Sequence, residues 1–208
     1  MAFYRTHILP RIVDKALGTK EATEARRSLC GGVHGDVVEI GFGSGRNLEH
    51  YPTAVTGVWA VEPSTTARRI AQARVSEARM PVTWAGLDGE RLDLPDGRFD
   101  SAVSTWTLCT IPDVAAALAE IRRVLKPGGV LHFVEHGRSP DAGVRRWQQR
   151  LEPINKRIAG GCHLQRPIAD LITDAGFGID ALETYYAKGD PKPFGYRYAG
   201  QARSGVMS

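Results

Sequence analysis

Short apolar runs alternate with amphipathic stretches along the first two thirds of the chain, and this alternation predicts a parallel β-sheet with crossover helices. Strands are expected at residues 37–40, 57–61, 82–84, 101–104 and 130–134, and helices at residues 45–51, 65–79 and 114–125. The last helix is the best defined, because apolar side chains recur every three or four residues from Val114 to Leu125. Asp113 precedes it as an N-cap, and the sequence KPGG ends it.

The order of the elements changes after the fifth strand. Residues 143–159 and 167–175 are expected to be helical, and two strands are expected at residues 179–187 and 196–201. The connection between these strands, KGDPKPFG, is too short for a parallel crossover, so the pair is predicted to be antiparallel. The fold class is therefore α/β, with one reversed strand in an otherwise parallel sheet and a single domain over residues 1–208.

Composition is that of an ordinary globular protein, with 42% hydrophobic and 24% charged residues. The sequence contains no run of about 18 apolar residues, so no membrane span is predicted, and the N-terminal stretch does not have the features of a signal peptide. The three cysteines are widely separated and odd in number, which favours reduced thiols over a disulfide framework. These features predict a cytoplasmic protein.

The net charge of +4 is unevenly distributed, since residues 122–166 hold ten Lys or Arg against three acids. A solvated helical face explains this excess, and attraction to an anionic substrate or a membrane surface is the alternative. Peripheral membrane contact is left open and not predicted. Because no nucleic-acid motif accompanies the basic residues, no nucleic-acid partner is expected.

The sequence VVEIGFGSGRN at residues 37–47 places glycines at positions 41, 43 and 45 directly after the first strand. Ligands of open α/β sheets bind at the carboxyl ends of the strands, so this loop is the expected site. A P-loop ends in Gly-Lys-Ser or Gly-Lys-Thr, which is absent here. The dinucleotide motif G-x-G-x-x-G would need a glycine where Arg46 stands.

Three acids follow three successive strands. Glu39 precedes the glycines, where a carboxylate repels pyrophosphate but suits a ligand with an ammonium and a sulfonium group. Glu62 is placed to accept ribose hydroxyl protons, and Asp88 to accept a hydrogen bond from an adenine amine. Each acid also has an ordinary role, since Glu62-Pro63 and Asp88-Gly89 suit turns. Together they favour S-adenosylmethionine (SAM) over a dinucleotide or a triphosphate.

The chain resembles the class I SAM-dependent methyltransferases in VVEIGFGSGRN, VEP, LDGERLDLPDGRFD and LKPGG, which occur in that order. The resemblance implies a Rossmann-like, seven-stranded, mostly parallel sheet whose last strand is antiparallel. It divides the single domain into a helical lid segment at 1–32, a SAM-binding core at 33–135 and substrate-side helices with the final strand pair at 136–208. The expected SAM-binding residues are Glu39, Gly41, Phe42, Gly43, Ser44, Gly45, Asn47, Glu62, Pro63, Asp88, Gly89 and Thr105.

Downstream sequences narrow the resemblance. VSTWTLCTIPD, FVEHG, WQQRLEP and GGCHLQR are similar to the methyltransferase-like thiol S-methyltransferases and their bacterial relatives, which favours a small thiol as methyl acceptor. The alternatives are a quinone or phenol methyltransferase and a phospholipid N-methyltransferase. An NAD-dependent oxidoreductase and a non-catalytic SAM-binding module are the alternatives from other classes.

Candidate residues for the acceptor side follow from these downstream sequences. His136 ends the fifth strand, where it faces the acceptor or pairs with Glu135, and His163 lies on a loop that can reach the same rim; both are candidate catalytic residues. Candidate substrate-binding residues are Trp106, Trp147 and Cys162 from these sequences, together with Tyr4 and His7, whose N-terminal segment is expected from the resemblance to close over the cofactor. Cys109 is interpreted as a small buried hydrophobe. The His and Cys spacings do not resemble a zinc site, so no metal is expected.

Overall fold

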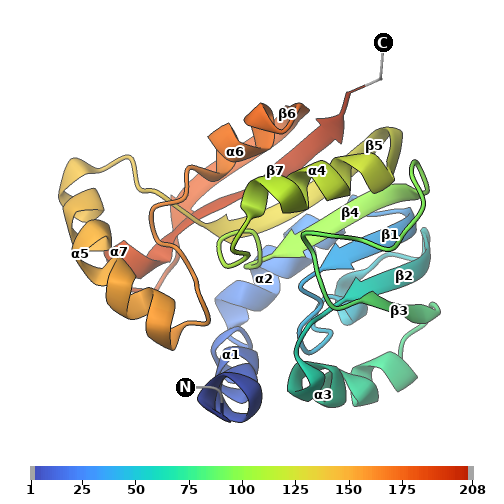
Figure 1. The fold of residues 1–208 in the computed structure, drawn as a ribbon, viewed down its shortest axis with the longest axis horizontal. Helices are drawn as coiled ribbons and strands as arrows, with labels where there is room; N and C mark the ends of the chain where they lie inside the picture. Colours follow the sequence, from blue (N-terminus) through green and yellow to red (C-terminus); the bar gives the residue numbers. More distant parts are fainter. Residues whose placement is uncertain (1–2, 206–208) are drawn as a thin grey trace.

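A single seven-stranded sheet organises the computed structural model, which describes residues 3–205 (Figure 1). Its strands are β1 (Gly35–Ile40), β2 (Val55–Val61), β3 (Val82–Gly86), β4 (Phe99–Thr105), β5 (Leu125–His136), β6 (Phe177–Tyr186) and β7 (Tyr196–Ser204). They lie in the order β3-β2-β1-β4-β5-β7-β6. β7 is antiparallel to both β5 and β6, whereas the other neighbours pair in parallel. The predicted Rossmann-like fold with an antiparallel last strand is confirmed.

Helices cover both faces of the sheet. The long ones are α1 (Leu9–Ala16), α2 (Lys20–Cys30), α3 (Thr65–Ser76), α4 (Val114–Val124) and α5 (Ala142–Ile158); shorter ones are η1 (Tyr4–Ile8), η2 (Leu48–His50), α6 (Ile168–Asp174) and α7 (Lys192–Gly195). Asp113 caps α4 by accepting from the Ala116 N–H at 3.0 Å, as its position predicts. Among residues 3–205, no helix combines the length and apolar composition needed to cross a membrane.

Two hydrophobic clusters lie on opposite faces of the sheet, because successive strand side chains point to opposite sides. One cluster joins Val38 of β1 to Leu118 of α4 and Ile172 of α6. The other joins its neighbour Val37 to Leu29 of α2 and Ala71 of α3. Both faces of the central strands are therefore buried, which explains why those strands are continuous apolar runs rather than alternating ones.

The strand order reverses beside β1. The chain winds outward from β1 through β2 to β3, and then returns to β4 on the other side of β1. Crossovers that leave in opposite directions separate at the carboxyl ends of β1 and β4, and ligands bind at such a switch point. The fold thus brings the glycine loop after β1 next to the segment that follows β4.

Two local predictions are corrected. The predicted helix at residues 45–51 is a single 3₁₀ turn, η2, because Gly41, Gly43 and Gly45 all have positive φ and hold the preceding backbone in a loop. The KPGG sequence does not separate helix from strand, since β5 already begins at Leu125 and continues through it. Gly128 takes a φ of 78° there, and the pairing of β5 with β4 shifts register next to it.

His132 on β5 gives the fold a predicted dependence on pH. The side chain is 1% exposed, and burial lowers its pKa to about 4. Between about pH 4 and 6.5 the unfolded chain therefore binds more protons than the folded one, and the free energy of unfolding falls as the pH falls. We expect a loss on the order of 3 kcal/mol from this residue alone across that window.

The contribution of His132 must be measured as a difference, because buried Glu39, with a pKa raised to about 7, acts in the opposite direction. The measurement is urea unfolding of the wild type and of His132→Asn at pH 4 to 7. The variant is expected to lose less stability toward pH 4. The matched control His7→Asn, at an exposed histidine, keeps the wild-type slope. Equal slopes in His132→Asn and wild type would contradict the prediction.

Candidate functional site

The loop after β1 approaches the segment after β4 too closely for any residue but glycine at position 41. A Cβ on Gly41 would lie 2.0 Å from Oγ1 of Thr107, and the residue also has a φ of 72°. Gly43 has a φ of 58°, and the nearest atom to a Cβ there would be the Gly41 carbonyl oxygen, at 3.8 Å. The first glycine therefore joins two strand ends, and the second leaves room for a ligand to approach the backbone.

Glu62 follows β2 and closes the glycine loop from the side. Its carboxylate accepts hydrogen bonds from the Gly43 N–H at 2.8 Å and the Ser64 N–H at 2.7 Å. The side chain is 7% exposed, and burial raises its pKa. Each oxygen has a lone pair beyond the one used, so Glu62 can also accept the ribose hydroxyls assigned to it. The adjoining Pro63 is exposed.

Glu39 lies beneath the glycine loop rather than at its surface. It is 1% exposed and accepts hydrogen bonds from Asn47 Nδ2 at 2.8 Å and from the Tyr51 hydroxyl at 2.6 Å. Asn47 also donates to Oγ1 of Thr105 at 3.2 Å. Burial raises the pKa of Glu39 to about 7. The structure thus gives Glu39 and Asn47 a structural task that the sequence did not indicate; their contact with the cofactor stays a prediction.

The adenine-side residues lie after β3. Asp88 is exposed and uses one oxygen to accept from the Glu90 N–H at 2.8 Å, which leaves the other free. Gly89 packs on β1, since a Cβ there would lie 2.8 Å from Cγ2 of Ile40. Phe42 is buried edge-on against Trp84, with ring centroids 5.3 Å apart. The ends of β2 and β3 therefore carry Glu62 and Asp88 at one edge of the sheet, whereas Glu39 is buried beneath the loop.

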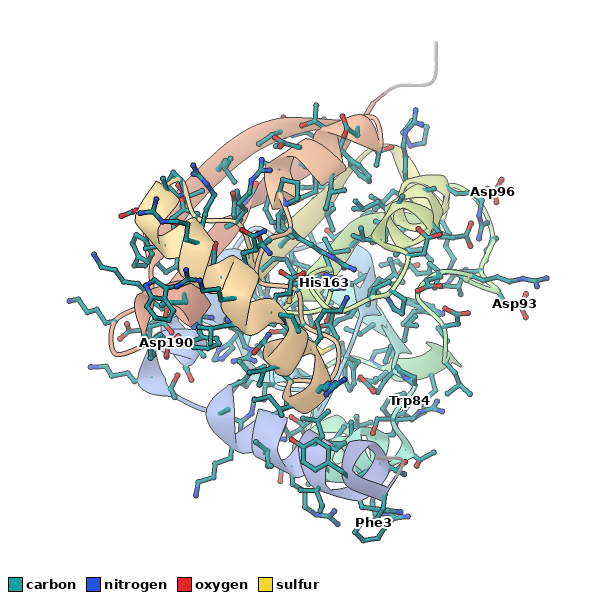
Figure 2. All side chains as sticks on the ribbon, turned by 60° about the vertical axis from the view of Figure 1, so that its left-hand side comes forward. Phe3, Trp84, Asp93, Asp96, His163 and Asp190 are labelled. Atoms are coloured by element: carbon teal, nitrogen blue, oxygen red, sulfur yellow. The ribbon has the colours of Figure 1, made fainter. Side chains whose placement is uncertain are left out.

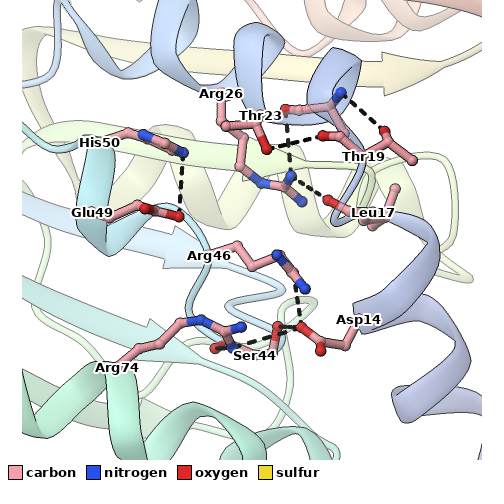
Figure 3. Close-up of polar contacts among 11 residues, drawn as sticks. Asp14, Leu17, Thr19, Thr23, Arg26, Ser44, Arg46, Glu49, His50 and Arg74 are labelled. Atoms are coloured by element: carbon pink, nitrogen blue, oxygen red, sulfur yellow. Dashed lines mark hydrogen bonds and ion pairs between the residues drawn. The ribbon is translucent and has the colours of Figure 1, made fainter.

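The N-terminal helix α1 is fastened to the glycine loop, a contact that sequence reasoning missed. Asp14 accepts from Ser44 Oγ at 2.5 Å and from Arg46 Nε at 2.8 Å, and Arg74 lies 3.6 Å away (Figure 3). These hydrogen bonds and the neighbouring arginines lower the pKa of Asp14 in spite of its partial burial. This contact lies on the chain segment expected to form a lid.

Tyr4 fastens the same segment to the acceptor side. Its hydroxyl donates to the carbonyl of Ile158 at the end of α5, at 2.8 Å. His7 is exposed and packs against Phe3, with ring centroids 5.0 Å apart. Substrate contact by Tyr4 and His7 stays a prediction, but Tyr4 now has a definite structural partner.

Trp106 begins the segment after β4 in a conformation rare for a side chain of its size, with a φ of 53°. The side chain is 7% exposed, and two guanidinium groups lie over its ring, those of Arg26 at 4.7 Å and Arg197 at 5.1 Å from the centroid. Both arginines are 4% exposed, and burial lowers the pKa of Arg26 to about 10. This cation–π stack holds Trp106 in place; its contact with substrate stays a prediction.

Glu135 does not pair with its neighbour His136, because consecutive side chains of β5 point to opposite faces. One oxygen of Glu135 accepts from Ser104 Oγ at 2.7 Å and from the N–H groups of Thr107 and Leu108 at 3.0 Å. The other accepts from the Cys109 N–H at 3.1 Å. The buried carboxylate thereby shapes the whole segment after β4. The predicted Glu135–His136 pair is wrong.

His136 instead meets two thiols. Its Nδ1 lies 3.9 Å from the Sγ atoms of both Cys109 and Cys162, and the sulfurs are 3.6 Å apart. The hydrogen shared by the sulfurs, together with His136, lowers the pKa of Cys162, whereas the same bond and burial raise the pKa of Cys109. Cys109 is fully buried, as expected, but is also part of a polar cluster. Local spacing in the sequence, on which the expectation of no metal rested, does not reveal this grouping.

Two further acceptor-side candidates lie on or near α5. His163 contacts Glu152 of α5, with Nδ1 3.2 Å from Oε1. Figure 2 labels His163. Burial lowers its pKa. Trp147 is 55% exposed on the outer surface of α5, where Arg150 lies 5.6 Å from its ring. The structure does not bring Trp147 into the cluster with His136, whereas the backbone N–H of His163 donates to the Cys109 carbonyl at 2.8 Å.

The arrangement fits SAM. Glu62 after β2 and Asp88 after β3 suit a ligand with ribose hydroxyls and an adenine amine. The space beside Gly43 lets that ligand approach the backbone.

Comparison with known proteins agrees with this geometry. A family model described as a methyltransferase domain matches residues 38–133. The chain is 34% identical over 162 residues to the thiol S-methyltransferase TMT1B of Rattus norvegicus, which covers 76% of this chain and 64% of the relative. It is 31% identical over 153 residues to a phosphatidylethanolamine N-methyltransferase of Cereibacter sphaeroides, covering 68% of this chain and 72% of the relative. The chain spans about three fifths of the length of the thiol S-methyltransferases it matches.

Solved structures share the fold. A SAM-dependent methyltransferase from Methanosarcina mazei matches with a TM-score of 0.67 at 22% identity, covering 83% of this chain and 93% of that one. At that identity the likeness concerns the fold alone, and the sequence relatives carry the family assignment. The chain belongs to the class I SAM-dependent methyltransferases, and SAM is its cofactor.

Proposed function

We propose that the chain transfers a methyl group from SAM to the sulfur of a small thiol. The observation that carries the proposal is its similarity to thiol S-methyltransferases, at 34% identity over 76% of the chain for the rat protein. The downstream sequences that resemble those enzymes include Cys109, His136 and Cys162, which form one cluster in the structure. The proposed acceptor side therefore holds two thiols and an imidazole, which are groups that suit a sulfur substrate.

Methyl transfer from SAM requires few catalytic groups from the protein. SAM supplies a methyl carbon activated by its positive sulfonium, so the chain must orient the acceptor and keep water out; orientation alone contributes on the order of 7–11 kcal/mol in favourable cases. A free thiol has a pKa of about 8.5 and ionises readily near neutral pH. Thr107, which touches Gly41, lies two residues before Cys109, so the thiol cluster adjoins the cofactor loop.

A phospholipid amine is the second candidate acceptor. The Cereibacter sphaeroides relative bears the name phosphatidylethanolamine N-methyltransferase, and the match covers more of its length than that of the rat thiol enzyme, 72% against 64%. An ammonium group must lose a proton before it can attack, so this acceptor needs a general base more than a thiol does. We favour the thiol, because the cluster offers sulfur and imidazole and its neighbour Glu135 is committed to four hydrogen bonds.

The proposed partner is a small-molecule methyl acceptor, with no nucleic acid. We place the activity in the cytoplasm, because Cys30, Cys109 and Cys162 are all free thiols. Membrane contact is not part of the proposal.

Transfer of label from SAM to a panel of small thiols, phenols and amines tests the proposal. We expect turnover of thiols at rates well above those of phenols and of ethanolamine phospholipids in vesicles. Heat-inactivated protein and S-adenosylhomocysteine serve as controls. Methylation of phenols or amines without methylation of any thiol would contradict the thiol acceptor. Tight SAM binding without any methyl transfer would favour a non-catalytic binding module.

A further inference from the structure

Three side chains able to bind a soft metal ion come together from three separate segments. Cys109 follows β4, His136 ends β5, and Cys162 lies between α5 and α6. Their ligand atoms all lie within 4.8 Å of one another. Two thiolates and an imidazole form a ligand set that zinc accepts.

The distances suit a zinc ion without rearrangement. The sulfurs are 3.6 Å apart and each is 3.9 Å from Nδ1 of His136, so a point equidistant from all three atoms lies about 2.2 Å from each in their plane and about 2.3 Å from each slightly above it, where a four-coordinate ion would lie. Zinc binds thiolate sulfur at about 2.3 Å and imidazole nitrogen at about 2.0–2.1 Å. The three atoms therefore already surround a position at zinc-binding distance.

Backbone hydrogen bonds hold the ligands where they are. The Cys109 N–H donates to Glu135 at 3.1 Å, and the Cys109 carbonyl accepts from the His163 N–H at 2.8 Å. Asn155 Nδ2 donates to the Cys162 carbonyl at 2.8 Å. The segments that carry both cysteines are thus fixed by backbone bonds that do not use the sulfurs, and Sγ of Cys109 also lies 3.6 Å from Oγ1 of Thr110.

Neither a disulfide nor simple packing accounts for all three side chains. The imidazole nitrogen of His136 is equally distant from both sulfurs. A disulfide between Cys109 and Cys162 would involve the sulfurs alone and would leave this nitrogen without a role. Packing of small hydrophobes does not require an imidazole nitrogen between two thiols. A zinc ion uses all three groups, and two thiolates neutralise its charge in a buried place.

The site has a closed side and an accessible side. Cys109 is fully buried, whereas Cys162 is 8% exposed and His136 is only partly buried. Three protein ligands with one remaining position are the arrangement of catalytic zinc sites, in contrast to four-ligand structural sites. The remaining position can open only toward the more exposed ligands.

We propose that Cys109, His136 and Cys162 bind one zinc ion, and that the fourth position of this ion takes the sulfur of the methyl acceptor. The second half rests on the proposed thiol methylation. The acceptor thiol releases its proton to solvent as its sulfur binds zinc. That sulfur then forms a bond to the methyl carbon, and the carbon–sulfur bond of the sulfonium breaks with its electron pair going to the departing S-adenosylhomocysteine. The neutral thioether product is a poorer ligand and leaves.

The metal is tested on the full chain, purified with a phosphine reductant and without chelator. Elemental analysis is expected to find one zinc per chain in the wild type and in Cys30→Ala, a control at a buried cysteine outside the cluster. Removing one ligand in Cys109→Ala, Cys162→Ala or His136→Ala should lower zinc affinity by more than about a hundredfold. Circular dichroism and S-adenosylhomocysteine binding verify that each variant is folded. Wild-type protein that neither contains zinc nor takes it up more tightly than folded Cys109→Ala/Cys162→Ala overturns the proposal.

The acceptor position is tested separately with cobalt as a spectroscopic replacement for zinc. Cobalt bound to the wild type should show thiolate charge-transfer bands, and 2-mercaptoethanol should shift its visible bands as a new sulfur ligand enters. An unchanged spectrum at saturating thiol overturns the fourth-ligand assignment. The outcomes are separable from those of the proposed function. Thiol methylation by metal-free protein overturns the binding of the acceptor to zinc and leaves the thiol acceptor standing. Zinc binding without thiol methylation leaves the zinc site standing and refutes the thiol acceptor.

Discussion

Glu135→Ala is expected to lower the free energy of unfolding by about 3–5 kcal/mol, since it leaves several buried donors without a partner and each costs about 1–3 kcal/mol. The donors are the Ser104 hydroxyl and the N–H groups of Thr107, Leu108 and Cys109. Residue 135 itself is fully buried, so bulk water does not reach these donors in the way it would at the surface. Urea unfolding followed by circular dichroism measures the loss.

Glu135→Gln is the matched variant for this prediction. One oxygen of Glu135 accepts three of the four hydrogen bonds, and an amide oxygen can keep these, whereas the amide NH₂ then faces the Cys109 N–H. We therefore expect glutamine to cost about 1–3 kcal/mol, less than alanine. An alanine variant within about 1 kcal/mol of the wild type would show that the segment after β4 is held by other contacts.

The sequence was most informative where local pattern and tertiary packing agree. The helix from Val114 was predicted from its periodicity, and its inner face, including Leu118 and Ile121, is fully buried. The helix predicted at residues 45–51 failed because periodicity takes no account of the backbone conformation that consecutive glycines allow. Gly45, with a φ of 77°, belongs to the ligand loop and not to a helix.

In the candidate site, too, some residues could be placed from the sequence and others could not. The positions of Gly41, Glu62 and Asp88 after successive strands could be predicted, because strand ends in a parallel sheet share one edge and the order of the chain identifies those ends. Asp14 could not, since its partner Ser44 lies 30 residues away on a different element. Such a contact depends on how α1 docks, which no local sequence signal specifies.

The thiol cluster shows the same limit on the acceptor side. Cys109 and Cys162 are 53 residues apart, and His136 is 27 and 26 residues from them. Zinc motifs recognisable from sequence place pairs of ligands within a few residues of each other. Here each ligand comes from its own segment, so only the packing of β4, β5 and the loop after α5 brings them together.

Glu62→Ala is expected to weaken SAM binding by about a hundredfold, or about 3 kcal/mol, because hydrogen bonds to a charged group contribute about 1.5–3 kcal/mol each. The variant removes the acceptor for the ribose hydroxyls and also releases the Gly43 N–H, so the glycine loop loses its support. Isothermal titration calorimetry with S-adenosylhomocysteine measures the change.

Two further variants separate the two tasks of Glu62. Glu62→Gln keeps one acceptor oxygen near the Gly43 N–H, and we expect an intermediate loss of about tenfold. Glu49→Ala removes a carboxylate that is 66% exposed just beyond the same loop, and should leave affinity unchanged. A folded Glu62→Ala with wild-type affinity would mean that the carboxylate supports the loop without touching the cofactor. Loss in Glu49→Ala as large as in Glu62→Ala would mean that general negative charge around the loop, and not the placement of Glu62 after β2, determines the affinity.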